Sequence, residues 1–108
     1  MSTTQSGEAT VVAASGELDA HAAPALQAAV GGPSLRPGGA LVIDLSAVDF
    51  IDSTGLGVIV ATLKHVRESH GTLAVVVGAP RVLKVFALTG LDAVIPLYSS
   101  LPDALKRA

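Results

Sequence analysis

One segment of the chain reads Ala40-Leu-Val-Ile-Asp-Leu-Ser-Ala-Val-Asp-Phe-Ile-Asp-Ser-Thr-Gly-Leu-Gly57, an apolar run that leads into a turn of hydroxyl and glycine residues. The run at 41–45 is nearly unbroken, which is typical of a strand buried on both faces. Beyond the turn, apolar side chains recur at every third or fourth position: Leu56, Ile59, Val60, Leu63 and Val66. This spacing predicts a helix with one face on a sheet, and Gly71 stands where a left-handed cap would end it. Ser53 is therefore predicted to lie at a helix N-terminus, at the end of a central strand.

The rest of the chain alternates between short apolar runs and helical patterns. Strands are expected at 10–14, 41–45, 72–77 and 94–97, and residues 1–6 are expected to be either frayed or a short edge strand. Further helices are expected after Pro24, around 82–86 up to a cap at Gly90, and over 101–106 after the capping residues Ser99 and Ser100. This alternation predicts the α/β class, with a mixed, mostly parallel sheet of four to five strands and about four helices. The loop at 31–39 is too short to divide domains, so residues 1–108 are expected to form a single domain.

The composition of the chain excludes several classes of function. The chain has 108 residues and a formal net charge of −2, which argues against nucleic acid and against a polybasic membrane contact. It has no cysteine, so disulfides and zinc–thiolate sites are excluded. No apolar run approaches the roughly 20 residues of a membrane span, and the N-terminus lacks the features of a signal peptide. A cytoplasmic protein without a cofactor is expected.

Ser53 is a weak candidate for a catalytic nucleophile. A hydrolase elbow needs Gly-x-Ser-x-Gly, and position 51 is Ile. On the same predicted helix, His65 would stand about 18 Å from Ser53 along the axis, far beyond hydrogen-bond reach. His21 precedes the serine, whereas hydrolases of this type place the histidine after it. A small Ser53-dependent hydrolase is retained only as a minor alternative.

The acidic residues and histidines offer two other sites to weigh. His21, His65 and His70 have no partner at a chelating spacing, so they are interpreted as surface residues and no metal is expected. Asp44, near the end of the predicted central strand, is a candidate phosphoacceptor of a receiver-like domain. Glu17 and Asp19 would then be the acidic pair that holds Mg²⁺. Such a site also needs a lysine after a late strand, and the last predicted strand is followed by none until Lys106.

The remaining hypothesis is that the hydroxyl of Ser53 is covalently modified. Asp52, Ser53 and Thr54 have side chains that cap a first helical turn, and such a turn also tolerates a phosphate, because its dipole and N–H groups favour anions. A phosphate would add about −1.5 to −2 charges beside Asp52. Burying such a charge unpaired in an interface costs several kcal/mol, so phosphorylation would act on whatever docks there.

Three segments carry a resemblance to a known family: Gly16-Glu-Leu-Asp19, Phe50-Ile-Asp-Ser-Thr-Gly-Leu-Gly-Val58 and Leu88-Thr-Gly-Leu91. In their order and spacing the chain resembles the STAS domain, and specifically the bacterial anti-sigma factor antagonists that regulate transcription in stress response and sporulation. The resemblance spans nearly the whole chain.

This resemblance implies a binding protein and not an enzyme. The unphosphorylated form would bind an anti-sigma factor that is also a serine kinase of ATPase fold, and would thereby free a sigma factor. The kinase would end this binding by phosphorylating Ser53, with Thr54 as the runner-up, and a Ser/Thr phosphatase would restore it. The residues that the resemblance assigns to partner binding are Glu17, Asp19, Asp52, Ser53, Thr54, Gly55 and Leu56.

Overall fold

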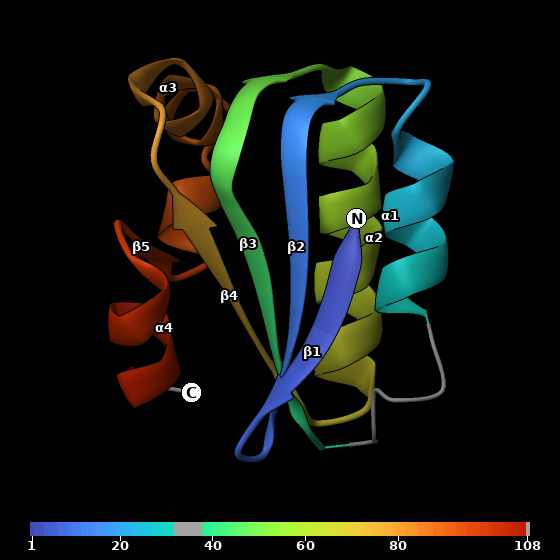
Figure 1. Cartoon of the computed structure of the whole chain (residues 1–108), viewed down its shortest axis with the longest axis vertical. Helices are drawn as coiled ribbons and strands as arrows, with labels where there is room; N and C mark the ends of the chain where they lie inside the picture. The colour runs from blue at the N-terminus through green and yellow to red at the C-terminus, as the bar shows by residue number, and fades with distance from the viewer. Residues whose placement is uncertain (32–37, 108) are drawn as a thin grey trace.

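Five strands form one sheet and four helices pack on it within residues 1–31 and 38–107, the residues that the computed structural model of the protein describes (Figure 1). The strands are β1 (Ser2–Ser6), β2 (Ala9–Leu18), β3 (Ala40–Ile51), β4 (Thr72–Val77) and β5 (Leu97–Tyr98). The helices are α1 (Ala23–Val30), α2 (Ser53–Glu68), α3 (Pro80–Thr89) and α4 (Leu101–Arg107), with a 3₁₀ turn at Leu91–Ala93. Most of the loop expected at 31–39 lies outside the described residues.

The sheet is mixed and mostly parallel, as predicted. Its spatial order is β1-β2-β3-β4-β5, with β1 antiparallel to β2 and the other neighbours parallel. The uncertain N-terminal segment is thus an edge strand. Beyond Leu45, which pairs with Val77 of β4, strand β3 continues beside β2 alone until Leu18 pairs with Ile51. The segments that follow β2 and β3 therefore leave the sheet side by side.

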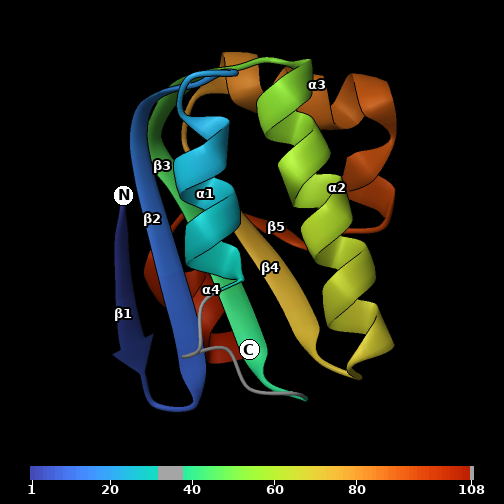
Figure 2. The ribbon, with the colours of Figure 1, turned by 90° about the vertical axis from the view of Figure 1, so that its right-hand side faces the viewer.

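Side chains that alternate along the strands build two unequal apolar layers. Figure 2 shows α1 and α2 side by side on one face of the sheet and α4 on the other. The larger layer joins α1, α2 and α3 to the sheet through Val12, Leu26, Ile43, Ile59, Val75, Phe86 and twelve further buried side chains of the same cluster. The smaller layer places Ala104 of α4 against Val11, Val42 and Val76. Strand β3 is covered on both faces, which is why its apolar run is nearly unbroken.

Three strands differ in their bounds from those predicted. Strands β2 and β3 are longer than expected, because they pair beyond their apolar runs, with register shifts between Ala13 and Ser15 and between Gly16 and Glu17. Gly16 has φ +78°, a left-handed conformation that suits glycine at such an irregularity. Residues 16–18 are therefore part of β2. The last strand begins at Leu97 instead of residue 94, because only Leu97 and Tyr98 pair with β4.

The C-terminus of α2 also corrects a prediction. His70, and not Gly71, is the residue in the left-handed conformation, with φ 62°. Gly71 is needed for a different reason, because a Cβ there would lie 2.6 Å from the Gly39 carbonyl oxygen. The expected left-handed cap at Gly90 of α3 is confirmed, with φ 78°.

We expect His70→Gly to stabilise the protein by about 1 kcal/mol, because glycine adopts the left-handed region without the Cβ clash. The matched control is His65→Gly inside α2, which should destabilise by about 0.5 kcal/mol, since the helix gains a glycine in ordinary helical geometry. Urea unfolding of the two variants measures both effects, and a loss of stability in His70→Gly would contradict the strained-cap interpretation.

Candidate functional site

Ser53 is the first residue of α2, as the sequence predicted, and a single residue separates it from the end of β3. Its side chain is exposed, and so is that of Thr54. None of the hydrogen bonds found among residues 1–31 and 38–107 uses the Ser53 hydroxyl. This hydroxyl is therefore open to solvent and carries no part of the hydrogen bonding that holds the turn.

Asp52 holds the turn instead. It has extended backbone geometry and is the N-cap of α2. Its Oδ1 accepts hydrogen bonds from the backbone N–H groups of Thr54 at 2.9 Å and Gly55 at 3.0 Å. The sequence indicated a cap somewhere in Asp52-Ser-Thr54, and the structure assigns it to the carboxylate alone. The two neighbouring hydroxyls are consequently free for other chemistry.

Gly55 brings the start of α2 against the end of β2. A Cβ at this position would overlap the Leu18 carbonyl oxygen and would lie 2.9 Å from the Leu18 Cγ. Gly55 is therefore required by close packing of the helix on β2. Gly57 is not, because nothing lies within 4 Å of a Cβ added there.

The turn between β2 and α1 lies beside the Ser53 turn and is held by Asp19. The Asp19 Oδ1 accepts hydrogen bonds from the backbone N–H groups of His21 at 3.1 Å and Ala22 at 3.0 Å. Its carbonyl oxygen accepts from the N–H of Ala23 at 2.8 Å. The Asp19 and Asp52 carboxylates are both half-buried and engaged with backbone, whereas His21 is exposed. Each turn is therefore shaped by one aspartate.

The structure gathers the seven residues assigned to partner binding at one end of the sheet, but it exposes them unequally. Glu17, Ser53 and Thr54 are exposed, Gly55 is buried, and Leu56 is half-buried against the main core. Sequence reasoning missed Leu18 and Ala20. Both act through backbone groups at this site, and a pattern of side chains gives no signal for such contacts.

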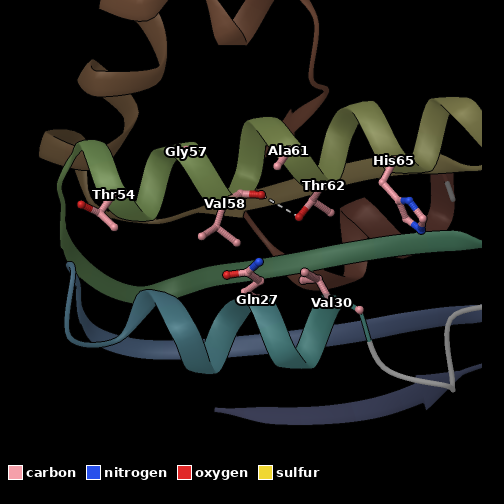
Figure 3. A pocket seen from close by; sticks show the side chains of 9 residues that line it. Gln27, Val30, Thr54, Gly57, Val58, Ala61, Thr62 and His65 are labelled. Carbon is pink, nitrogen blue, oxygen red and sulfur yellow. Dashed lines mark hydrogen bonds between the residues drawn. The ribbon is translucent and has the colours of Figure 1, made fainter.

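A groove of about 530 Å³ runs between α1 and α2, next to this end (Figure 3). It is lined by Gln27, Val30, Gly31, Thr54, Gly57, Val58, Ala61, Thr62 and His65. Thr54 and His65 stand at opposite ends of the groove, and the Thr62 hydroxyl is engaged with the Val58 carbonyl at 2.7 Å. Ser53 is not among the lining residues, so this groove does not supply the pocket that a Ser53 hydrolase would need.

Asp44 is poorly placed for the receiver-like alternative. It lies in the middle of β3, where it pairs with Ala13 and Val76, and not near the end of the strand as predicted. Glu17 pairs with Phe50, six residues further along β3, which corresponds to about 20 Å at 3.3 Å per residue. The proposed acidic pair is thus remote from Asp44. Within the described part of the chain, no group of three or more His, Asp or Glu side chains is arranged to hold a metal ion.

None of the described helices is both long and apolar enough to cross a membrane.

The chain is similar to proteins of one known family. Residues 1–104 match the profile of the family described as the STAS domain. The chain is 37% identical to the anti-sigma-B factor antagonist of Listeria monocytogenes over 82 residues, which are 76% of this chain and 72% of the relative. It is 39% identical to the anti-sigma-F factor antagonist RsfB of Mycobacterium tuberculosis over 95 residues, 88% of this chain and 77% of the relative.

A solved structure extends the match to three dimensions. The crystal structure of an anti-sigma factor antagonist from Mycobacterium paratuberculosis superposes with a TM-score of 0.86 at 40% sequence identity. The superposition covers 97% of this chain and 89% of that one. The fold and the order of its elements are therefore shared along nearly the whole chain.

Proposed function

The chain belongs to the STAS-domain family, and from this membership we propose that it is an anti-sigma factor antagonist controlled by phosphorylation of Ser53. The unphosphorylated chain binds an anti-sigma factor that is also a serine kinase, and this binding releases a sigma factor. The kinase ends the interaction by transferring a phosphate to Ser53, and a Ser/Thr phosphatase restores it. The role of the chain is to bind, and not to catalyse.

The observation that carries this proposal is the free, exposed hydroxyl of Ser53 on a turn that is held by other groups. Asp52 and Gly55 fix the start of α2 without using the serine side chain. A phosphate on Ser53 therefore breaks no hydrogen bond of the scaffold. It also lies at a helix N-terminus, where an anion is tolerated.

The surroundings of Ser53 support a switch that acts on a partner. Asp52 lies directly before the serine, and Glu17 is exposed on the adjoining end of β2. A phosphoserine would concentrate negative charge on this end of the sheet, in a surface that a partner must desolvate. The partner class follows from the relatives, which are named as antagonists of anti-sigma factors. Thr54 is the runner-up acceptor, since it is exposed as well.

The binding function is tested by sigma factor release. A preformed complex of an anti-sigma factor kinase and its sigma factor, from the organism that encodes this chain, is titrated with the unphosphorylated protein. We expect the sigma factor to be displaced and the chain to co-elute with the kinase in size-exclusion chromatography. If none of the ATPase-fold anti-sigma kinases of that organism forms a complex, the proposed function is wrong.

A further inference from the structure

Two turns that are far apart in the sequence meet at the end of the sheet. The first is the Ser53 turn, which comprises residues 52–55 at the start of α2, and the second is the β2–α1 turn, which comprises residues 19–22. The Asp52 N–H donates to the Leu18 carbonyl at 3.2 Å, and the Ala20 N–H donates to the Asp52 Oδ2 at 3.2 Å. The second bond joins residues 32 positions apart and spans directly from one turn to the other.

Capping alone does not account for this use of the Asp52 side chain. The cap needs one acceptor oxygen, which is Oδ1, and Ser, Thr or Asn would supply it about as well. The second oxygen accepts from Ala20, in another segment of the chain. Only a carboxylate offers acceptor oxygens in both directions, because Asn has a donor in place of the second oxygen and Ser has a single short hydroxyl.

These bonds join the two turns into one unit. Asp19 fixes the β2–α1 turn internally through two backbone N–H groups, and Asp52 then fixes the position of this turn relative to Ser53. A partner that contacts both turns has less chain to order on binding. Phosphoryl transfer likewise depends on the hydroxyl being held in line with the incoming phosphate, and small misplacements are costly there.

We propose that Asp52 is a positioning residue for the modification of Ser53, and that it acts through the bond of its Oδ2 to Ala20. The inference rests on the function proposed above, and it explains how the β2–α1 turn, whose Asp19 is assigned to partner binding, is held in a fixed position relative to Ser53. This role requires no contact between the Asp52 side chain and the phosphate or the partner. It makes the partner meet the two turns in a single fixed arrangement.

The test separates this bond from the cap. Asp52→Ser keeps a strong cap residue but cannot reach Ala20, and Asp52→Asn keeps one cap oxygen while placing a donor opposite the Ala20 N–H. Asp49→Asn is the control, because it removes one exposed carboxylate from β3, three residues before Asp52. Each purified variant is phosphorylated with the anti-sigma kinase and ATP. The rate of Ser53 phosphorylation, the Kd for the kinase and the exchange rate of the Ala20 amide proton are measured.

Both Asp52 variants are expected to lose about tenfold or more in kcat/KM for phosphorylation, and to exchange the Ala20 amide faster, while Asp49→Asn matches the wild type. If Asp52→Ser restores wild-type kinetics, Asp52 is only a cap and the inference is overturned. The same holds if Ala20 exchange is accelerated and the kinetics do not change. A wild-type chain that the kinase neither binds nor modifies would instead refute the proposed function itself.

Discussion

Gly55→Ala is expected to destabilise the protein by about 3 kcal/mol, the upper range for overpacking a tight contact. The added methyl group would overlap the Leu18 carbonyl oxygen, which is fixed in β2 by the pairing of Leu18 with Ile51. A flexible side chain could move aside, but a backbone carbonyl of a paired strand can move only at the cost of its strand pairing. In a domain of this size the change corresponds to a fall of roughly 10–20 °C in the thermal midpoint, measured by circular dichroism.

Gly57→Ala is the matched control, because it lies two residues away in the same helix and nothing surrounds its Cβ position within 4 Å. It should raise stability by about 0.5–1 kcal/mol, since alanine is the better helix former. The opposite signs of the two substitutions follow only if α2 begins in contact with the end of β2. Equal stability of the two variants would show that this close approach does not exist.

Phosphorylation of Ser53 is expected to weaken binding of the anti-sigma factor kinase several-hundredfold. The phosphate adds about −1.5 to −2 charges to a surface that must be desolvated in the complex. An unpaired charge in an interface costs several kcal/mol, and about 3–4 kcal/mol gives a factor of several hundred. Isothermal titration calorimetry of the phosphorylated and unmodified chain against the kinase measures this ratio.

Two variants separate charge from the mere loss of the hydroxyl. Ser53→Ala should bind the kinase with the affinity of the unmodified chain. The affinity of Ser53→Asp should lie between those of the unmodified chain and the phosphoprotein, because a carboxylate carries a smaller charge than a phosphate. The thermal midpoint should be nearly unchanged in all of them, since the Asp52 bonds that hold the turn remain. Comparable affinities of the phosphorylated and unmodified chains would refute the switch.

The sequence predicted the position of Ser53 well because the relevant signals are local. The apolar run before the turn and the spaced apolar residues after it indicated a strand followed by a helix, and both are present as β3 and α2. The full length of β3 was not predictable in the same way. Polar residues such as Ser46 and Asp49 interrupt its pattern, and the strand continues there only because β2 pairs with it.

The contacts that shape the site depend on backbone groups of distant segments, and these leave no side-chain pattern. Gly71 was predicted to be a left-handed cap, but the residue in the left-handed conformation is His70. Position 71 must be glycine because a Cβ there would collide with the carbonyl oxygen of Gly39. In the same way, the second bond of Asp52 depends on the Ala20 N–H. Sequence reasoning identified the residues that matter at this turn, and only the three-dimensional arrangement shows what holds them.

The location of the transferred phosphate tests the account most directly. The wild-type chain, Ser53→Ala and Thr54→Ala are incubated with the anti-sigma factor kinase and ATP, and the modified residue is identified by tandem mass spectrometry. We predict one acid-stable phosphate on Ser53 in the wild type and in Thr54→Ala, and none in Ser53→Ala. Labelling of Ser53→Ala at the wild-type rate, or an acid-labile phosphate on Asp44, would contradict the account.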